Sequence, residues 1–439
     1  MSGLYCVFVR YTLRIDQPLY RRNIEPSLHA ALADTPVVAI TGARQSGKST
    51  LAEKVAVGIG AQTASFDDAE FRAAAIADPA GFVEGASLPL LIDEFQKAPE
   101  ILDAIKARVD RERRGGARPA GLFLLTGSAN VWATLRISES LAGRAERIPL
   151  WPLSQGEIAG KRETFIETLF GGDPPAAPRA EGGRAAISER IVAGGYPEML
   201  ARPSARRRAR WIQSYLQMIL ERDARDLAGR ARQLDELPRL LKFAAARMSS
   251  LLDLADLGAA VEMKRDSVSR YLHLLELMYL VQRAPAWRRN LGQRLIKAAK
   301  LRLPDSGLAA QLVGYDARRF EDIEDPFNGA LFENFVAGEL TKQASWAERE
   351  VRLHHFRTAG GREVDIVLED STGDVVGVET KLGATPRESD FRGLAHLRDK
   401  LGEKFKAGVL VNTGTQTLPF GDRLWVAPVI SLWDGIANA

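Results

Sequence analysis

Cysteine is nearly absent from this sequence, since Cys6 is the single one among 439 residues. One cysteine excludes an internal disulfide framework and any zinc site built from several cysteines. Long apolar stretches are missing as well, because no run reaches the ~18 residues that suggest a membrane span. Met1–Arg14 contains Arg10 and Arg14 and a short apolar run, but lacks the order and length of a signal peptide. We therefore expect a leader over residues 1–19, a cytoplasmic protein and no membrane partner.

A strong charge of one sign is also absent, since the formal net charge is only +4. The basic residues are nevertheless uneven, because arginines crowd one stretch at Arg206, Arg207, Arg208, Arg210, Arg222, Arg225, Arg230 and Arg232. A basic surface of this kind attracts polyanions by neutralising phosphates. Acidic residues are interleaved with it, so a salt-bridged solvent-exposed face is the alternative. Charge alone does not decide whether the partner is nucleic acid.

The most informative stretch is Val37–Leu51, which reads VVAITGARQSGKSTL. Its β-branched apolar start predicts a buried strand that breaks at Gly42, and helical character follows from Thr50. Between them lies the spacing G-x-x-x-x-G-K-S, whose glycines let backbone N–H groups curl around a phosphate. Lys48 can reach the terminal phosphates and the Ser49 hydroxyl can ligate Mg²⁺, at a helix end that favours anions. The sequence predicts a nucleoside triphosphate site made by Gly42, Ala43, Arg44, Gln45, Ser46, Gly47, Lys48, Ser49 and Thr50.

A second apolar run, Leu88–Glu94, ends in two carboxylates and has the character of a buried parallel strand. Ligands gather at the carboxyl ends of such strands, so we expect Asp93 beside the Mg²⁺ shell and Glu94 orienting the attacking water. A helix-start acid is the alternative interpretation of Glu94. Another buried strand, Gly121–Thr126, follows a helical segment. This alternation predicts an α/β domain, a parallel sheet with helices on both faces.

These segments resemble the AAA-type branch of the phosphate-loop ATPases. GARQSGKS is similar to the Walker A motif, LLIDE to Walker B, and LLTGS to the strand that carries the sensor-one residue. The resemblance implies ATP and Mg²⁺ as ligands and Ser128 as the sensor. It also implies an arginine finger within Ser138–Ser154, with Arg144 as the candidate and Arg147 as the alternative. Such a finger stabilises charge on the transferring phosphate, whereas an arginine that only tethers the strand or pairs with an acid does not.

The middle of the chain is largely helical by pattern. Gly171–Arg184 is rich in glycine, proline and alanine and is typical of a linker, while Ile187–Met248 suits a helical lid beside the nucleotide. Ser249–Val281 predicts a helix, a break near Gly258 and a second helix from Asp266. Its apolar face holds Val268, Leu272, Leu275 and Tyr279, and Lys264, Arg265, Ser269 and Arg270 point outward.

This second unit looks like a winged helix-turn-helix, with Trp287–Asn290 and Lys297–Arg302 as a basic wing. The second helix of such a module enters a major groove in DNA-binding members. The same module also serves protein contacts, so DNA and a protein partner both stay open.

The last part of the chain begins with a helix over Asp325–Ala337 that carries Glu333. Short β-rich segments follow and predict a mixed sheet: Val351–Phe356, Glu363–Leu368, Val375–Lys381 and Ala407–Asn412. Asp365 in one strand and Glu379-Thr380-Lys381 in the next resemble the core of the PD-(D/E)XK nuclease superfamily. Carried over, Asp365 and Glu379 hold Mg²⁺, Glu333 completes the metal shell and Lys381 positions the water. Alternating charges on a half-exposed strand can produce the same pattern, and such folds can persist without chemistry.

From about Tyr20 to Trp433 the chain resembles bacterial and archaeal ATPases that join an AAA-type domain to a C-terminal region of unknown function. We expect an ATPase domain at 20–170, a linker at 171–186, a lid-like region at 187–248, a winged helix at 249–320 and a restriction-endonuclease-like α/β domain at 321–439. The first hypothesis is a Mg²⁺-dependent ATPase that acts on DNA or RNA through its C-terminal region, with nuclease activity open. The alternative is an ATP-dependent switch that binds a protein partner and has an inactive nuclease-like domain. Under either hypothesis a homo-oligomer or a complex with another protein is open.

Overall fold

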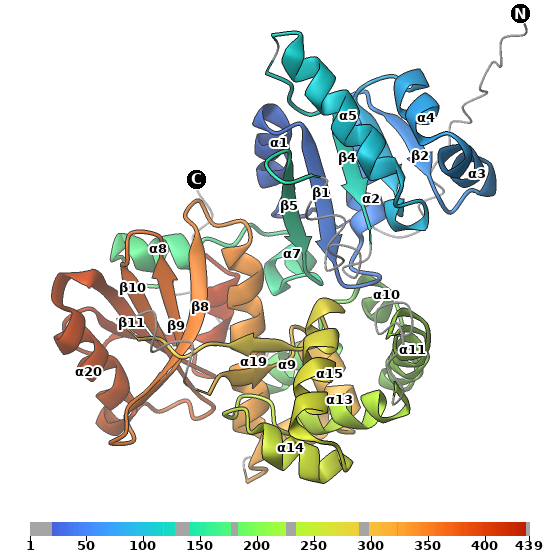
Figure 1. Ribbon diagram of the computed structural model, residues 1–439. Coiled ribbons are helices and arrows are strands. Elements are labelled where there is room, and N and C mark those ends of the chain that lie inside the picture. Colours follow the sequence, from blue (N-terminus) through green and yellow to red (C-terminus); the bar gives the residue numbers. More distant parts are fainter. Residues whose placement is uncertain are drawn as a thin grey trace, which may run out of the picture.

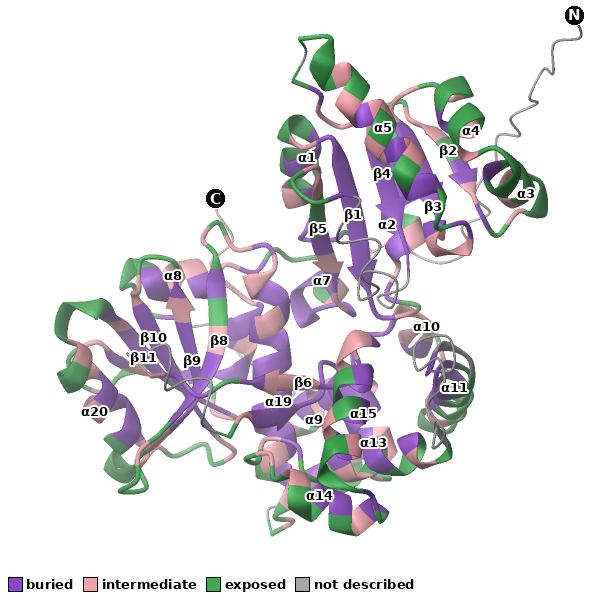
Figure 2. Cartoon of the chain, in the orientation of Figure 1, coloured by how far each residue is buried: buried purple, intermediate pink, exposed green. Residues whose placement is uncertain are grey.

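The computed structural model describes residues 20–116, 118–127, 141–176, 183–224, 234–288, 298–322 and 324–435. A sheet domain stands above a helical region and a second sheet domain, which lie side by side (Figure 1). Buried residues fill both sheets and the inner faces of the helices (Figure 2). Nowhere in these ranges is a helix long and apolar enough to cross a bilayer.

The N-terminal sheet is parallel, with the strand order β2-β3-β4-β1-β5. Its strands are β1 Val37–Gly42, β2 Gln62–Ser65, β3 Leu90–Asp93, β4 Phe123–Thr126 and β5 Ala145–Leu150. The helices around it are α1 Glu25–Asp34, α2 Lys48–Gly58, α3 Ala69–Ala77, α4 Pro79–Gly85 and α5 Ile101–Arg114. Val37 and Ala39 pack on the α5 side, while Val38 and Ile40 pack against α1 and α2. Both faces are covered, as the apolar strands require.

The helical region continues the chain beyond the sheet. It consists of α7 Gln155–Ala159, α8 Phe165–Gly171, α9 Gly183–Ala193, α10 Pro197–Leu200, α11 Ala205–Met218, α13 Leu237–Ala246, α14 Leu254–Val261, α15 Arg265–Leu277, α17 Ser306–Leu312 and α18 Ala317–Glu321. An antiparallel pair, β6 Gln282–Ala284 with β7 Lys300–Arg302, follows α15. Short turns of other helix types lie at Phe95–Lys97, Ile219–Asp223, Leu234–Glu236, Glu388–Phe391, Gly402–Lys404 and Val429–Leu432.

The break expected near Gly258 is wrong, because Gly258 lies inside α14. Asp253 caps this helix by accepting hydrogen bonds from the N–H groups of Ala255 and Asp256. A Cβ on Gly258 would lie 2.6 Å from the carbonyl oxygen of Met263, so the glycine allows the following turn to close tightly. Glycine here permits a close approach and does not end the helix.

The C-terminal sheet is mixed, with the order β12-β13-β11-β10-β9-β8. Its strands are β8 Val351–Arg357, β9 Glu363–Asp370, β10 Val375–Lys381, β11 Phe405–Asn412, β12 Leu418–Pro419 and β13 Leu424–Pro428. One face packs on α19 Phe327–Ala344 and the other on α20 Arg392–Leu401. Alternation along β11 follows from this, since Val409 faces the first core and Leu410 the second.

Two parts of the expected division differ from the packing. Helix α8, expected at the end of the ATPase domain, contributes its apolar face to the core beneath the C-terminal sheet, and α9 and α17 join it there. Helix α9 also begins at Gly183, inside the expected linker. In the other direction, Trp346 after α19 is buried in the core of the N-terminal domain. Neighbours in space, more than neighbours in sequence, decide which core an apolar face joins.

Candidate nucleotide site and C-terminal carboxylate cluster

The loop between β1 and α2, Gly42–Ser49, has the curled backbone of a phosphate loop. Gly42 has φ +149° and Gly47 has φ +94°, values that suit glycine. A Cβ on Gly42 would lie only 2.1 Å from the carbonyl oxygen of Leu150 on β5. Lys48 starts α2 and donates from Nζ to the carbonyl oxygens of Gly42 and Ala43, at 3.2 and 2.9 Å. The lysine is therefore held in the curl of the loop.

Asp93 at the end of β3 joins three neighbouring elements. The Ser49 hydroxyl donates to its Oδ1 at 2.9 Å, Ser65 approaches its Oδ2 at 3.5 Å, and the Thr126 hydroxyl also donates to it. These side chains come from α2, β2 and β4. Because parallel strands share one carboxyl edge, the contacts converge beside the phosphate loop. A hydroxyl and a carboxylate are hard oxygen ligands, so Ser49 and Asp93 fit a Mg²⁺ ion.

Glu94 has an unusual backbone for a residue other than glycine, with φ +56° and ψ +40°. Its N–H donates to Thr126 Oγ1 at 3.4 Å, and the Gln96 amide donates to its carboxylate. Burial, together with the charge of Asp93, raises the pKa of Glu94. A left-handed residue held by its neighbours at the end of a strand is typical of functional sites. A carboxylate with a raised pKa is a better proton acceptor.

Side chains far away in sequence hold the outer side of the phosphate loop. Arg22 donates from Nη1 to the carbonyl oxygen of Ser46 at 2.8 Å and from Nε to Glu157 Oε1 at 3.0 Å. The Tyr215 hydroxyl on α11 donates to the carbonyl oxygen of Arg44 at 3.0 Å. Arg22 and Tyr215 were not predicted to belong to the site, because no local motif marks a contact made over such separations.

A path of polar contacts continues from Arg22 to the C-terminal domain. Glu157 belongs to α7, and the N–H of Gln155 in the same helix donates to Glu339 Oε2 on α19 at 2.7 Å. Lys342 on α19 donates one hydrogen bond to Glu339 at 2.7 Å and another to the carbonyl oxygen of Leu153, just before α7, at 3.0 Å. All these groups are buried. Buried polar groups are costly unless paired, so this interface holds a defined geometry.

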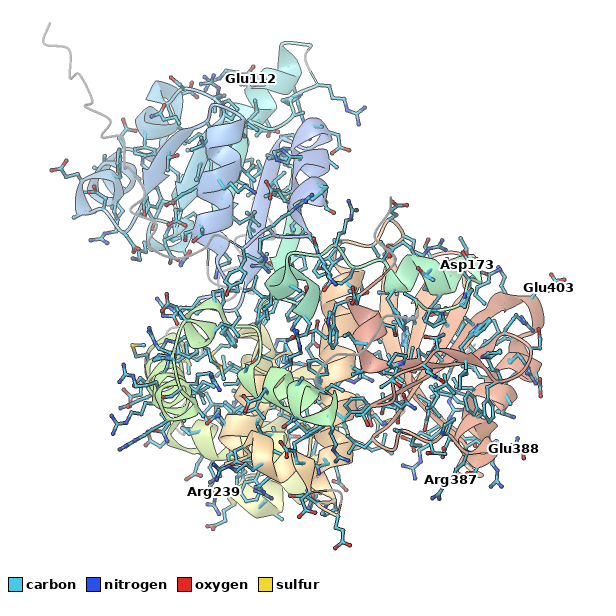
Figure 3. The ribbon with its side chains drawn as sticks, turned by 180° about the vertical axis from the view of Figure 1, so that it is seen from behind. Glu112, Asp173, Arg239, Arg387, Glu388 and Glu403 are labelled. Atoms are coloured by element: carbon cyan, nitrogen blue, oxygen red, sulfur yellow. The ribbon has the colours of Figure 1, made fainter. Side chains whose placement is uncertain are left out.

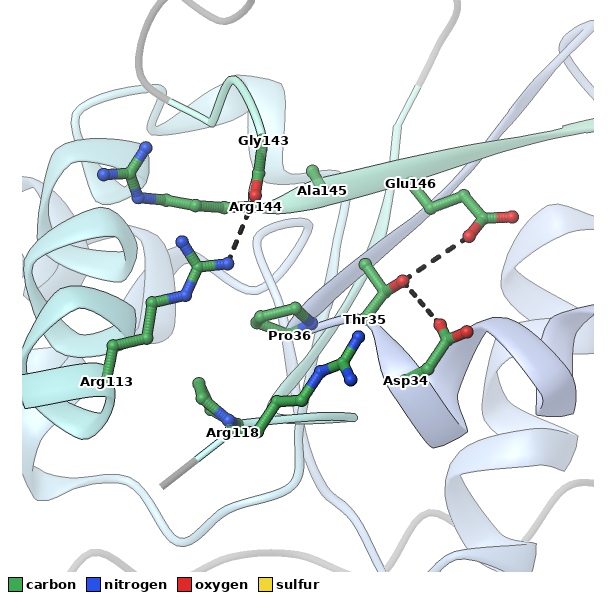
Figure 4. Close-up of a pocket in the computed structure, with 10 residues that line it drawn as sticks. Asp34, Thr35, Pro36, Arg113, Arg118, Gly143, Arg144, Ala145 and Glu146 are labelled. Carbon is green, nitrogen blue, oxygen red and sulfur yellow. Dashed lines mark hydrogen bonds between the residues drawn. The ribbon is translucent and has the colours of Figure 1, made fainter. Parts of the chain in front are cut away.

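Arg144 lies at the amino ends of the strands, whereas the phosphate loop lies at their carboxyl ends. Its carbonyl oxygen accepts from the N–H of Val37 at the start of β1, and its guanidinium forms two hydrogen bonds to Asp110, at 2.7 and 2.9 Å. Val37 and Gly42 are five positions apart along the strand, a distance of about 17 Å. Arg144 therefore cannot reach the phosphate loop of its own chain. Arg144, Arg113 and Arg118 are among the residues that line a pocket here, and Figure 4 shows the side chain of Arg144 pointing away from Thr35 and Pro36. The alternative, Arg147, is exposed on the edge strand β5, and Ser128 lies outside the described residues.

The second helix of the expected winged helix, α15, has the predicted faces in part, since Ser269 is half-buried and Tyr279 lies beyond the end of the helix. Lys264, Arg265 and Arg270 are exposed, while the apolar face is buried. The expected basic wing differs, because Lys300 and Arg302 of β7 are buried. The N–H of Trp287 donates to the carbonyl oxygen of His355 on β8 at 2.6 Å, which docks this segment on the C-terminal sheet. Lys300 meets carboxylates and Arg302 donates to the backbone carbonyl oxygen of Asp365, so neither side chain points toward solvent. Residues 289–297 lie outside the described ranges.

The four C-terminal residues expected to form a metal site lie in one region, and each meets a lysine or a backbone group. Lys300 Nζ lies 2.9 Å from Glu333 Oε1 and 3.2 Å from Asp365 Oδ1. Asp365 Oδ2 accepts from the N–H and hydroxyl of Thr380, at 3.0 and 2.8 Å. Lys381 Nζ lies 2.9 Å from Glu379 Oε1. Burial and the nearby Asp365 raise the pKa values of Glu333 and Glu379 to about 8.

Comparison with protein families divides the chain into three matched segments. A model of AAA domains matches residues 34–159, the domain of unknown function DUF8612 matches residues 184–319, and the domain of unknown function DUF4143 matches residues 328–432. Together with the strand order and the phosphate loop, the first match defines the N-terminal part as an AAA-type phosphate-loop domain. That part of the expected resemblance is confirmed, whereas the winged-helix and nuclease-like identities stay predictions.

Among curated proteins, uncharacterized proteins Rv2008c of Mycobacterium tuberculosis and Mb2031c of Mycobacterium bovis are each 30% identical over 409 residues. The alignment covers 93% of this chain and 83% of each relative. This chain belongs to the family of these two mycobacterial proteins.

Solved structures of lower similarity include the Walker-type ATPase PABY2304 of Pyrococcus abyssi, at 16% identity and a TM-score of 0.39. That match covers 67% of this chain and 96% of the other. The RuvB Holliday junction branch migration motor of Thermotoga maritima is 17% identical, with 60% and 89% covered and a TM-score of 0.29. Scores this low leave the fold assignment to the strand order and the phosphate loop described above.

The close approach of Gly42 to β5 gives a test of the loop. Gly42→Ala should weaken ATP binding and lower the melting temperature, because the new methyl group overlaps the carbonyl oxygen of Leu150. Gly58→Ala is the matched control, since nothing lies within 4 Å of its Cβ position. Binding and melting of the two variants should be measured side by side. Equal behaviour of Gly42→Ala and Gly58→Ala would contradict this account of the loop.

Proposed function

We propose that this protein is a Mg²⁺-dependent ATPase that works as a switch for its own helical and C-terminal regions. The observation that carries the proposal is the convergence of Ser49, Thr126 and Ser65 on Asp93, directly beside the curled loop and Glu94. A turn that happens to contain Gly-Lys-Ser does not need a buried carboxylate in contact with its serine. The family match to AAA domains supports the same reading.

In this mechanism the backbone N–H groups of the loop bind the phosphates of ATP, and Lys48 exchanges its carbonyl partners for the terminal phosphates. Ser49 and Asp93 would hold Mg²⁺, which supplies positive charge to the phosphate oxygens. Glu94 orients a water molecule and accepts its proton, a role that its raised pKa suits. Gln96, which donates to the Glu94 carboxylate, fixes the orientation of that side chain.

The switch follows from what touches the loop. Arg22 and Tyr215 bind carbonyl groups of the loop, so a change of loop conformation on ATP binding alters their partners. Tyr215 belongs to the helical region, and Arg22 leads through Glu157 and α7 to Glu339 on α19. Two regions therefore respond to one loop. A ligand shifts such an equilibrium only by its different affinity for the two states, and the loop contacts supply that difference.

Arg144 enters the proposal as an arginine finger that acts on a second copy of the chain. It cannot reach its own loop, and it lies with Arg113 and Arg118 at the rim of the sheet. A homo-oligomer in which this rim meets the nucleotide of a neighbour gives the arginine its role. In this structure the guanidinium is paired with Asp110, which is the alternative expected for this arginine. The finger role therefore requires Arg144 to exchange Asp110 for the phosphate of the neighbour.

A second candidate function is binding of nucleic acid through α15. The observation that favours it is the exposure of Lys264, Arg265 and Arg270 around the start of a helix whose opposite face is buried. DNA is the partner expected for this arrangement, with RNA as the alternative. The buried β7 removes part of the expected basic surface, which leaves α15 and the exposed arginines of α11 for phosphate contacts.

We predict opposite defects for two variants of the nucleotide site. Lys48→Ala should weaken ATP binding, whereas Glu94→Gln should bind ATP and hydrolyse it roughly 100-fold or more slowly. With ATP trapped, Glu94→Gln should also change amide exchange in α7 and α19, and Lys48→Ala should not. Phosphate release, nucleotide binding and hydrogen exchange measure these effects. Wild-type turnover in either variant would refute the site, and unchanged exchange in α19 would refute the switch alone.

The finger is tested by mixing variants. Arg144→Ala should slow turnover by about 1,000-fold or more, and mixing it with Lys48→Ala should restore part of the activity. The gain arises because a Lys48→Ala neighbour still supplies its Arg144 to an intact site. Asp110→Asn is the matched control, since it breaks the ion pair and keeps the guanidinium. A mixture no more active than Arg144→Ala alone would rule out action between copies.

For nucleic acid, we predict that Lys264→Ala, Arg265→Ala and Arg270→Ala together weaken DNA binding. The slope of log affinity against log salt should become shallower by about one unit for each lost phosphate contact. Arg387→Ala is the control, because this exposed arginine lies on the C-terminal domain, away from α15 (Figure 3). Fluorescence anisotropy at several salt concentrations measures the slope. An unchanged slope in the triple variant assigns α15 to protein contacts.

A further inference from the structure

Lys300 on β7 is a buried cation with three carboxylate partners. Its side chain is 4% exposed, and its Nζ lies 2.9 Å from Glu333 Oε1, 2.9 Å from Glu363 Oε1 and 3.2 Å from Asp365 Oδ1. An ammonium group has three N–H donors, so each carboxylate can accept one of them. The carboxylates come from α19 and β9, whereas the lysine comes from the strand pair that follows α15.

The ammonium stands among oxygens that the resemblance to nucleases gives to a divalent metal. Glu333 and Asp365 are two of the three ligands expected for that metal, and both bind Lys300. The other oxygen of Asp365 is bound by Thr380, and the third ligand, Glu379, pairs with Lys381. Within the described ranges no three His, Cys, Asp or Glu residues are arranged to hold a metal ion. These side chains therefore do not fit a divalent cation as they stand.

The strand that carries Lys300 is fixed on both sides. Asn334 on α19 accepts from the N–H of Leu303 at 2.8 Å and donates to its carbonyl oxygen at 2.9 Å. Arg302 donates to the carbonyl oxygen of Asp365 at 2.9 Å. Removing one partner from a buried ion pair leaves an uncompensated charge, which is strongly unfavourable. The lysine therefore cannot be a surface side chain that happens to rest on the cluster.

We propose that Lys300 is the resident cation of this cluster, where it takes the place of a divalent metal and joins the helical region to the C-terminal sheet. The cluster accepts a divalent ion only when the ammonium is gone. With Lys300 in place the carboxylates stabilise a contact between domains and do not cut phosphodiester bonds. This inference does not depend on ATP hydrolysis.

The test measures Mn²⁺ binding to the full chain without nucleotide. Electron paramagnetic resonance reports the free Mn²⁺ that remains, and thermal melting reports the effect of Mn²⁺ on stability. Wild type and Asp365→Asn should bind the same amount of Mn²⁺, which means that no Mn²⁺ site of the wild type depends on Asp365. Lys300→Met should gain one Mn²⁺ site, with a higher melting temperature in Mn²⁺, since a ligand of the folded state stabilises it. Adding Asp365→Asn to Lys300→Met should remove the site.

Lys342→Met is the matched control, because Lys342 is equally buried on α19 and its partner Glu339 stands apart from the cluster. It should gain no Mn²⁺ site. Binding to wild type that is lost in Asp365→Asn overturns the proposal, as does a folded Lys300→Met protein that binds no Mn²⁺. If Lys300→Met does not fold, the wild-type comparison decides: absence of Asp365-dependent binding supports the proposal, and its presence overturns it.

Discussion

The contact between Gly42 and Leu150 is the constraint on which the nucleotide site depends. With a Cβ position 2.1 Å from the carbonyl oxygen of Leu150, β1 and β5 approach too closely for any side chain where the loop begins. This closeness sets the direction in which the loop leaves the sheet. It also brings Trp151, just after β5, to the guanidinium of Arg22, which binds the same loop. Neighbouring strands thus shape the loop as much as its own sequence does.

Much of the nucleotide site could be predicted because its parts are local. The spacing from Gly42 to Ser49 and the two acids at the end of β3 are contiguous patterns, each tied to one strand end. Parallel pairing then brings those ends together without further information. Arg22 and Tyr215 could not be found this way. Arg22 is 24 positions in sequence from its partner Ser46, and Tyr215 is 171 positions from its partner Arg44. No sequence periodicity predicts contacts over such separations.

In the C-terminal region, too, the elements could be predicted from the sequence but a contact between distant residues could not. The strands β9 and β10 and the helix with Glu333 agree with the expectation. Glu333 and Asp365 meet at Lys300, whereas Glu379 pairs with Lys381. The sequence pattern did not predict that Lys300 would bind these carboxylates, because Lys300 was expected to be a basic residue of an exposed wing. Its role depends on Trp287 and Asn334 docking the strand pair. Burial reverses the meaning of a charge, from a surface for phosphates to an internal counter-ion.

Trp346 has a consequence for how the chain is made. It is buried in the same core as Leu28, Ile40 and Val55, although more than 280 residues of sequence lie between Val55 and Trp346. A nascent chain that has left the ribosome only as far as the helical region lacks this part of its first core. The N-terminal domain therefore completes its packing late in synthesis, after the chain has passed through the helical region. The domain that is synthesised first therefore completes its hydrophobic core only after Trp346 has been synthesised.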